Sequence, residues 1–328
     1  MNILSALDDT ASGVRHGAFT VPHSSDESAW GNVVVPVSVV VGVRPGPTAL
    51  LIAGNHGDEF EGPIVLHDLL STLEASAVTG RVIVIPALNP PAVEAGRRTS
   101  PLDGANMNRV FPGRRDGGPT ARIAAFVVEE LLPRADAVLD LHSGGRTLEF
   151  LPFAASHGDG TAAAESARLR DAFAAPYSVL LRDPDPAGLL DGVVEGMGKP
   201  FVTTELAGGG TTTPDTLQIA RRGVGNFLRA LGILDGDVPS RRPGPLLTMP
   251  GDDCFVLAPA SGLLEPLAGL GDAVEEGEPV ALIRDIFTPD AAVPVIATRS
   301  GIVAGRHFFG RVRRGDCVAV LAVSVGAT

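Results

Sequence analysis

The stretch Gly54–Gly62, GNHGDEFEG, sets one histidine among several carboxylates directly after the apolar run TALLIA. His56 and Glu59 stand three positions apart, where a strand pattern gives way to a helix pattern, so both side chains can reach one ion. Zinc in proteins binds nitrogen or oxygen ligands at about 2.0–2.2 Å, and a catalytic zinc takes three protein ligands and a water. The same acidic residues also suit a plain helix start, where negative charge complements the helix dipole. This stretch alone leaves both interpretations open.

A second histidine follows another apolar strand pattern, in AVLDLHSGG. His142 ends this strand before a glycine turn, which places it at the same edge of a parallel sheet as His56. Asp140 lies two positions earlier on the same side of the strand and could orient the imidazole. We therefore predict His56, Glu59 and His142 as metal ligands, with Glu61 as a less favoured substitute for Glu59. The alternative for His142 is an unrelated histidine at a strand end.

A hydrolytic metal site also needs a base for the attacking water and a positive group for the developing oxyanion. Glu205 ends the apolar strand PFVTTEL before a glycine-rich turn. Because an isolated buried charge is costly, a carboxylate there should be functional or paired, and we predict Glu205 as the general base. The polar segment 95–113 could hold a substrate carboxylate through arginine forks, or could be a solvated surface loop. Its candidate residues are Arg97, Arg98, Asn108 and Arg109.

These positions depend on a framework in which strand and helix patterns alternate. Strand patterns occur at 33–43, 48–54, 81–89, 136–145, 177–182 and 200–206, and helix patterns occur from 62 onward and at 120–133, 160–174, 187–197 and 215–234. Such alternation predicts an α/β fold with a mostly parallel sheet covered by helices on both faces. In these sheets the ligand site forms at the carboxyl ends of the strands.

The pattern changes in the last quarter of the chain. The proline- and glycine-rich segment 239–253 indicates a linker between a catalytic domain at 1–238 and an all-β domain at 254–328. The latter contains a weak repeat, beginning at Ser261 and again at Ser300, which predicts a small barrel or sandwich with approximate twofold symmetry. It resembles lipoyl and biotinyl carrier domains but lacks their modified lysine, so we expect a cap or an oligomerisation module.

Composition narrows the class of protein. The chain has 328 residues, 45% of them hydrophobic, and a net charge of −12, which argues against a nucleic-acid partner. Two cysteines are too few for a disulfide framework or a thiolate zinc site. We find neither a signal-peptide pattern nor an apolar run of the roughly 18 residues that a membrane span needs. We expect a soluble, cytoplasmic protein without a membrane partner.

Four segments together resemble the succinylglutamate desuccinylase/aspartoacylase family, a branch of the zinc carboxypeptidase superfamily. They are GNHGDEFEG, NMNRVFPG, DLHSGG and TTELAGGG, in the family's order, and the resemblance extends over essentially the whole chain. It implies a zinc-carboxypeptidase-like α/β domain and a C-terminal β domain that partly covers the active site. It also implies one zinc ion per chain on His56, Glu59 and His142, with Glu205 as the catalytic carboxylate.

The resemblance implies roles for the polar segment as well. Asn108 and Arg109 would hold the substrate carboxylate, and one arginine of the pair Arg97 and Arg98 would polarise the scissile carbonyl. We assign this second role to Arg98.

Within the family, GRRTSPLDGANMNRVFPGR and the ending SGIVAGRHFFGRVRRGDCVAV are similar to the deacetylases of ectoine degradation. Those enzymes act on Nα-acetyl-L-2,4-diaminobutyrate. Aspartoacylases use a C-terminal tyrosine in substrate binding, and this chain lacks it, since its single tyrosine is Tyr177. That difference weakens an N-acetylaspartate assignment. Asp183 and Asp185 could receive the cationic side chain of diaminobutyrate, or could belong to a proline-rich surface turn.

We therefore expect a zinc-dependent amidohydrolase that removes an acyl group, most simply acetyl, from a small N-acyl amino acid. Three alternatives are a deacylase for succinyl or aspartyl substrates, a zinc carboxypeptidase that cuts peptides, and a non-enzymatic ligand-binding protein on the same fold. The sequence leaves the formation of a homo-oligomer open.

Overall fold

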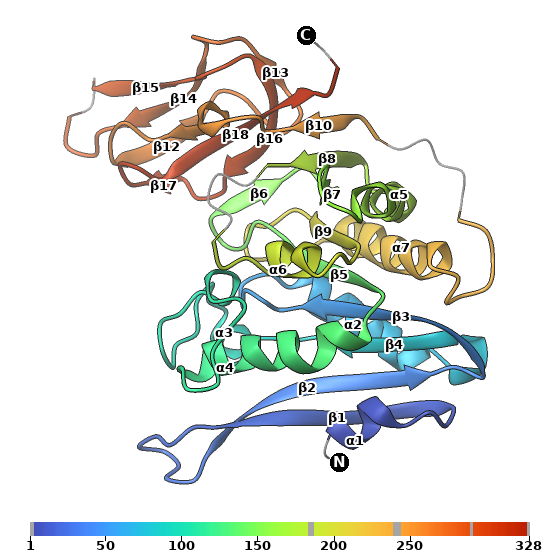
Figure 1. The fold of residues 1–328 in the computed structure, drawn as a ribbon. Coiled ribbons are helices and arrows are strands. Elements are labelled where there is room, and N and C mark those ends of the chain that lie inside the picture. The colour runs from blue at the N-terminus through green and yellow to red at the C-terminus, as the bar shows by residue number, and fades with distance from the viewer. Residues whose placement is uncertain (1–2, 183–186, 239–243, 289–290, 327–328) are drawn as a thin grey trace.

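The apolar runs of the N-terminal three quarters lie side by side in one large twisted sheet (Figure 1). The computed structural model describes residues 3–182, 187–238, 244–288 and 291–326. From its outer edge, the sheet runs in the order β1-β2-β4-β3-β5-β9-β7-β8-β10 and then continues into C-terminal strands. These strands are β1 (Gly13–Pro22), β2 (Asn32–Val41), β3 (Arg44–Ala53), β4 (Thr79–Ile85), β5 (Ala137–His142), β7 (Phe153–His157), β8 (Tyr177–Leu181), β9 (Phe201–Glu205) and β10 (Leu246–Thr248). The short strand β6 (Leu148–Phe150) lies off this order and pairs with a C-terminal strand.

The centre of this sheet is parallel. Strands β4, β3, β5 and β9 pair in parallel, and so do β7, β8 and β10. Antiparallel pairs occur at the outer edge, where β1 meets β2 and β2 meets β4, and at the junction of β9 with β7. The mostly parallel α/β sheet expected from the sequence is therefore confirmed.

Helices cover both faces of the sheet, and Figure 1 shows α4 and α6 on the near side. The α-helices are α1 (Ile3–Asp8), α2 (Glu61–Thr72), α3 (Pro90–Ala95), α4 (Pro119–Phe126), α5 (Ala163–Phe173), α6 (Leu190–Gly196) and α7 (Pro214–Ala230). Residues of α1, α4 and α6 share one buried apolar cluster, and residues of α2, α5 and α7 share another. Among the described residues, no helix has the length and apolar character needed to cross a membrane.

Strand β3 explains why the sheet needs two layers of helices. Its last five residues are all buried, with Leu50 and Ile52 in the first cluster and Leu51 and Ala53 in the second. Because successive side chains of a strand point to opposite faces, a wholly apolar strand must be covered on both sides. β5 is buried over its full length in the same way.

Two glycines let the segment between β3 and α2 fold tightly. Gly54 has φ 66°, in the left-handed region that side chains disfavour. A Cβ on Gly57 would lie 1.9 Å from the carbonyl carbon of Ala92 in α3. The chain therefore turns sharply after β3 and presses against α3, which fixes the position of the intervening histidine, His56.

The C-terminal strands form a small β sandwich that lies beyond β8 and β10 (Figure 1). They are β11 (Phe255–Leu257), β12 (Gly262–Pro266), β13 (Ala273–Val274), β14 (Pro279–Arg284), β15 (Ala292–Ile296), β16 (Gly301–His307), β17 (Arg311–Val312) and β18 (Cys317–Ser324). One sheet has the order β15-β14-β12-β17, and the other strands extend the large sheet. The two layers enclose one apolar cluster.

The two sequence repeats are interlocked in the sandwich, because the middle strand of each repeat pairs with a strand of the other repeat. The first repeat supplies β12, β13 and β14, and the second supplies β16, β17 and β18. Each long first strand pairs with its own third strand and with the short middle strand of the other repeat: β12 with β17, and β16 with β13. The approximate twofold symmetry expected from the repeat is therefore visible in the strand pairing.

Some local features differ from the sequence patterns. The strand pattern at 48–54 begins too late, because β3 already starts at Arg44, which pairs with Thr79 before a register shift. The helix expected at 120–133 breaks into α4, a π-helical turn (Val127–Leu131) and a 3₁₀ turn (Leu132–Arg134). The division into domains at 239–253 stays a prediction: residues 239–243 lie outside the described part, and β10 pairs with both β8 and β18.

Candidate metal centre and active site

Three neighbouring strand ends bring the predicted site residues together. His56 follows β3, His142 is the last residue of β5, and Glu205 is the last residue of β9. These strands are parallel neighbours, and His142 is the register partner of Glu205. The carboxyl ends of the three strands therefore meet at one edge of the sheet, where the sequence placed the site.

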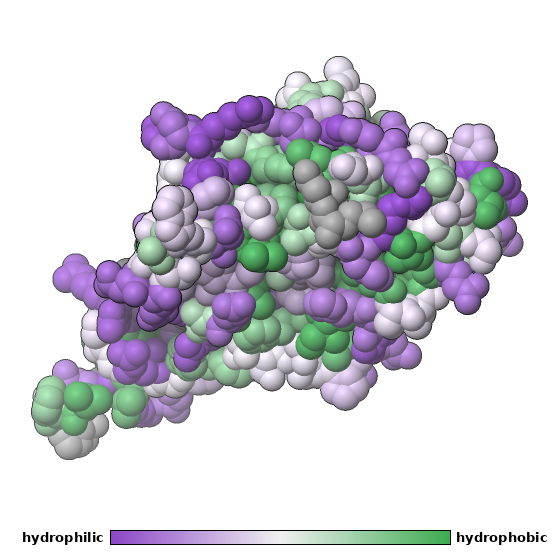
Figure 2. All heavy atoms as spheres, turned by 90° about the horizontal axis from the view of Figure 1, so that it is seen from below, coloured by the Kyte–Doolittle hydropathy of each residue, from purple (hydrophilic) through white to green (hydrophobic). Residues whose placement is uncertain are grey.

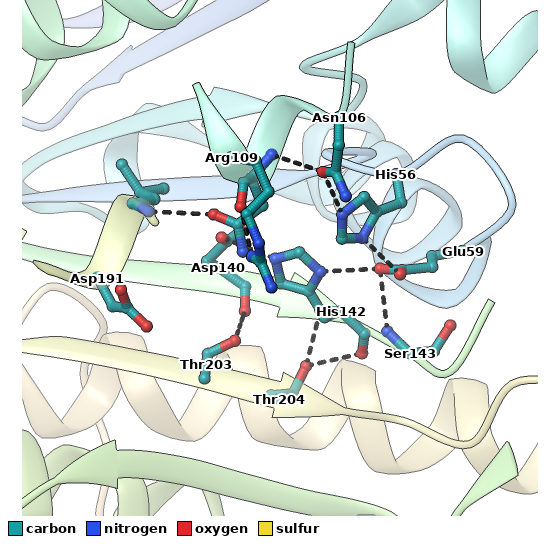
Figure 3. Close-up of polar contacts among 12 residues, drawn as sticks. His56, Glu59, Asn106, Arg109, Asp140, His142, Ser143, Asp191, Thr203 and Thr204 are labelled. Carbon is teal, nitrogen blue, oxygen red and sulfur yellow. Dashed lines mark hydrogen bonds and ion pairs between the residues drawn. The ribbon is translucent and has the colours of Figure 1, made fainter. Parts of the chain in front are cut away.

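Two imidazoles flank one carboxylate in this site (Figure 3). Nδ1 of His56 lies 2.7 Å from Oε1 of Glu59, and Nδ1 of His142 lies 2.9 Å from Oε2 of the same side chain. All three residues are buried, and one ligand atom from each lies within 4.8 Å of the others. Glu61 is also buried but is not part of this group, so the geometry favours Glu59 as the carboxylate of the set.

The second nitrogen of each imidazole is held by another side chain. Nε2 of His142 donates to Oδ2 of Asp140 at 2.9 Å, and Nε2 of His56 donates to Oδ1 of Asn106 at 3.1 Å. The backbone N–H of Ser143 donates to Oε2 of Glu59 at 3.3 Å. Such contacts fix the ring orientation and leave both Nδ1 atoms facing the shared carboxylate, as metal ligation requires.

The electrostatics of the cluster follow from burial and close charges. Burial opposes ionisation of Glu59, but the charges of His56 and His142 outweigh it and hold the pKa of this carboxyl well below its usual range. Burial likewise opposes a charged His142, yet Asp140 and Glu59 outweigh it and raise the pKa of this imidazole well above its usual value. Burial raises the pKa of Glu61 to about 7.

This donor set fits a divalent transition metal. Two imidazole nitrogens and one carboxylate oxygen are the protein ligands that open catalytic zinc sites use. His56, Glu59 and His142 could therefore hold a metal ion, which would displace the proton between each imidazole and the carboxylate.

Glu205 lies beside this cluster. Its Oε2 is buried and has no hydrogen-bond partner among the described residues. Burial, followed by the charge of Glu59, raises the pKa of Glu205 to about 8, although His142 and Arg98 act in the opposite direction. A carboxylate whose pKa is raised in this way is suited to take and return a proton near neutral pH.

The cluster opens into a cavity of about 680 Å³ between the α/β part and the C-terminal β sandwich. Besides His56, Glu59 and His142 (the candidate metal-binding group) and Glu205, polar residues reach the cavity from the loops, and the C-terminal segment adds an apolar wall. The polar residues include Arg98, Asn108, Arg109, Arg182 and Asp191, and the C-terminal segment contributes Met249, Phe255, Leu257 and Val320. A mostly apolar cavity with a few polar groups is the usual form of a small-molecule site.

The C-terminal sandwich also contacts the loops that carry the site residues. β16 pairs with β6, which follows His142 along the chain. The N–H of Phe308 donates to the carbonyl of Thr147 at 2.9 Å, and a Cβ on Gly209 would lie 2.6 Å from the Phe308 ring. The sandwich therefore packs against the loop after His142 and the loop after Glu205.

Comparison with known proteins agrees with this geometry. Residues 45–231 match the succinylglutamate desuccinylase/aspartoacylase catalytic domain. The chain is 48% identical over 325 residues to an N-alpha-acetyl-L-2,4-diaminobutyric acid deacetylase of Halomonas elongata, covering 98% of this chain and 94% of that protein. The chain belongs to the succinylglutamate desuccinylase/aspartoacylase family.

Solved structures place it firmly within this family. The product-bound ectoine utilization protein EutE of Ruegeria pomeroyi is 48% identical, with a TM-score of 0.93 and 97% of each chain covered. A succinylglutamate desuccinylase of a Silicibacter species is 45% identical, with a TM-score of 0.91, covering 97% of this chain and 96% of that one. As a member of the family, the protein is a hydrolase of amide bonds, which confirms the expected enzyme class.

The structure brings most of the predicted site residues of this family member to one chamber. Arg97 and Arg98 are both exposed. Arg98 lines the cavity, with Nη1 3.4 Å from Oε1 of Glu59, whereas Arg97 is not among the described residues that line it. Asn108 and Arg109 both line it. Asp183 and Asp185 lie outside the described residues. The roles of all these residues stay proposals.

Two polar residues of the site were missed in the sequence. Asn106 holds His56 across 50 positions of sequence, and its neighbours in NMNR gave no sign of that contact. Asp191 lines the cavity as a buried carboxylate at the start of α6. A signal for Asp191 existed, since an acidic residue in the apolar pattern LLDGVV is unusual unless it is paired or functional.

Proposed function

We propose that this protein is a zinc-dependent deacetylase of Nα-acetyl-L-2,4-diaminobutyrate. The observation that carries the proposal is the His56–Glu59–His142 group beside Glu205 in a cavity that the C-terminal sandwich lines on one side. The name of the Halomonas elongata relative supports the substrate. The wall that the C-terminal sandwich adds to the cavity also suits a small N-acyl amino acid better than a peptide chain.

His56, Glu59 and His142 would hold the metal ion, and zinc is the ion that this donor set suits best. When bound, zinc supplies a Lewis acid and lowers the pKa of a bound water from 15.7 to about 7. Asp140 and Asn106 keep the imidazoles turned so that both Nδ1 atoms face the site.

Glu205 acts as the base in this scheme. Its carboxylate takes the proton of the attacking water and later delivers it to the nitrogen of the leaving amine. The guanidinium of Arg98 lies at the metal-binding group and stabilises negative charge on the acyl oxygen. A general base of this kind contributes about 10²–10⁴ in rate.

Asn108 and Arg109 bind the α-carboxylate of the substrate. Oδ1 of Asn108 accepts the backbone N–H of Leu190 at 3.0 Å, so its amide NH₂ is turned away from α6 and can donate to a carboxylate. The guanidinium of Arg109 donates to the backbone carbonyl of Asn108 at 2.6 Å, which holds this guanidinium against the Asn108 backbone.

A panel of substrates on the zinc-loaded protein tests the proposed function. The panel contains Nα-acetyl-L-2,4-diaminobutyrate, N-acetyl-L-aspartate, N-succinyl-L-glutamate and a C-terminal dipeptide, compared by kcat/KM. We expect the first substrate to exceed each of the others at least tenfold. Preference for the dipeptide would reassign the protein as a carboxypeptidase.

A desuccinylase is the second candidate, because the Silicibacter relative carries that name and Arg182 also lines the cavity. In that case the guanidinium of Arg182 would bind the distal carboxylate of a succinyl group. Preference for N-succinyl-L-glutamate in the same panel would favour it. We infer a cytoplasmic location from the sequence alone.

A further inference from the structure

Asp191 is a buried carboxylate in the wall of the active-site chamber. It is the second residue of α6 and is 9% exposed. The same cavity reaches His142 and Glu205, so Asp191 and the His56–Glu59–His142 group line one cavity. Figure 3 shows Asp191 on the opposite side of Asp140 and Arg109 from His56 and Glu59.

Local hydrogen bonds fix the position of Asp191. The N–H of the preceding residue, Leu190, donates to Oδ1 of Asn108 at 3.0 Å. The N–H of Gly192 donates to Oδ1 of Asp191 at 2.5 Å, and the N–H of Phe111 donates to the carbonyl of Gly188 at 3.2 Å. The start of α6 is therefore bound to the loop that carries Asn108 and Arg109.

The other carboxylates that line the cavity have different surroundings. Glu59 contacts both His56 and His142, Asp140 holds His142, Glu205 is the register partner of His142, and Asp252 is exposed at the C-terminal side. Asp191 thus supplies buried negative charge at a distance from the metal-binding group. Cations also line the chamber, namely Arg98, Arg109 and Arg182.

We propose that Asp191 binds the side-chain ammonium of the substrate and thereby selects an N-acyl amino acid with a short cationic side chain. This inference rests on the proposed function and identifies the residue that sets its specificity. Asn108 binds the α-carboxylate, and Asp191 follows the residue whose N–H Asn108 accepts. An amide that can bind a carboxylate and a carboxylate that can bind an ammonium therefore stand close together, as the two charged groups do in 2,4-diaminobutyrate.

The proposed contact also predicts discrimination against acidic side chains. An aspartyl or glutamyl side chain in this position would bring a second carboxylate to Asp191. Like charges in a buried site repel and lose hydration, so such a substrate binds poorly. A neutral side chain with the shape of the diaminobutyrate side chain is not repelled by Asp191, but it forms no ion pair with it.

The test compares two substrates of the same shape in wild type and in Asp191→Asn. Nα-acetyl-L-2,4-diaminobutyrate carries the ammonium, and Nα-acetyl-L-norvaline replaces it with a methyl group. A hydrogen bond to a charged group stabilises a complex more than one between neutral groups does. We therefore expect Asp191→Asn to lower kcat/KM for the cationic substrate about 10- to 100-fold. The value for the norvaline derivative should change less than about threefold by the same reasoning, since it makes no such bond.

Two control variants distinguish a change in substrate specificity from a general loss of folding or metal binding. Glu195→Gln alters another acidic residue of α6, which pairs with His157 outside this cavity, and should leave the ratio of the two kcat/KM values unchanged. Asp191→Glu keeps the charge and should retain part of the preference. Zinc content and thermal midpoint are measured for each variant.

The outcomes are distinct. Loss of the preference for the cationic substrate in Asp191→Asn supports the inference. An equal fall for both substrates, or an unchanged ratio, overturns it while the deacetylase function stands. If the wild type does not hydrolyse the diaminobutyrate derivative, the proposed function itself fails, and the role of Asp191 fails with it.

Discussion

Oδ2 of Asp140 accepts a hydrogen bond from Nε2 of His142 at 2.9 Å, between two residues on the same face of β5. This contact decides which imidazole nitrogen faces Glu59, and it follows from strand geometry, because residues two apart point to the same side. A carboxylate behind a ligating histidine also makes the imidazole a stronger ligand.

Replacing Asp140 should therefore weaken metal binding before it affects folding. We expect Asp140→Asn to lower zinc affinity about 10- to 100-fold, as is typical for partners of ligating histidines. Competition with a chromophoric chelator measures the change. Asp215→Asn, at an exposed position at the start of α7, is the control. An unchanged affinity in Asp140→Asn would show that the contact does not support a metal ligand.

Metal affinity should fall as the pH is lowered. The carboxylates of Asp140 and Glu59 raise the pKa of His142 well above its usual value, against the effect of burial. A proton on Nδ1 blocks ligation, so it competes with the metal at a higher pH than it would at an ordinary histidine. Zinc titrations between pH 8.5 and 6 should show a continuous loss of affinity on acidification, with proton release on binding. A flat profile would contradict this ligand assignment.

Glu205 should be needed for turnover and not for metal binding. We expect Glu205→Gln to retain zinc and to lose about 10²–10⁴ in kcat, the usual contribution of a general base. Metal content and steady-state rates on the same preparation measure both properties. Near-normal turnover in a zinc-loaded Glu205→Gln variant would assign the base elsewhere.

We expect the C-terminal sandwich to increase kcat by positioning the loop after Glu205 through Phe308. This ring packs on Gly209, in the loop that follows Glu205, while its backbone N–H contacts Thr147. Removing the ring in Phe308→Ala should lower kcat several-fold with unchanged zinc content. Phe287→Ala removes a ring that is 86% exposed and should change neither quantity. If the two variants behave alike, the packing on Gly209 does not position the catalytic loop.

Gly57 should be essential for the turn that carries His56. A Cβ there would overlap the Ala92 backbone, which cannot move without shifting α3. Overpacking of this kind costs about 1–3 kcal/mol or more, so we expect Gly57→Ala to lower the thermal midpoint and zinc affinity together. Gly310→Ala, where a Cβ meets nothing within 4 Å, is the matched control. Equal midpoints for the two variants would contradict the packing.

The candidate metal-binding group could be predicted because each of its residues stands next to a strand that is recognisable in the local sequence. His56, Glu59, His142 and Glu205 each follow an apolar strand, and parallel strands bring their carboxyl ends to one edge. The strand patterns themselves were clear, because wholly apolar runs such as that of β3 must be buried on both faces.

Contacts between distant segments could not be predicted in this way. The bond from His56 to Asn106 depends on how the loop before α4 folds back over the sheet. The apolar wall of Phe255, Leu257 and Val320 depends on how the C-terminal sandwich docks. Neither produces a periodic pattern or a local motif. Edge strand β1 was missed for a related reason: its polar and apolar residues alternate only imperfectly.

Acetate release from Nα-acetyl-L-2,4-diaminobutyrate during zinc titration of the metal-stripped protein tests the central claim most directly. The stripped protein should be inactive, and activity should rise linearly with added zinc to a plateau at one ion per chain. A His142→Ala variant under the same conditions should stay inactive at one equivalent. Full activity in the stripped protein, or zinc bound at one equivalent without acetate release, would contradict the account.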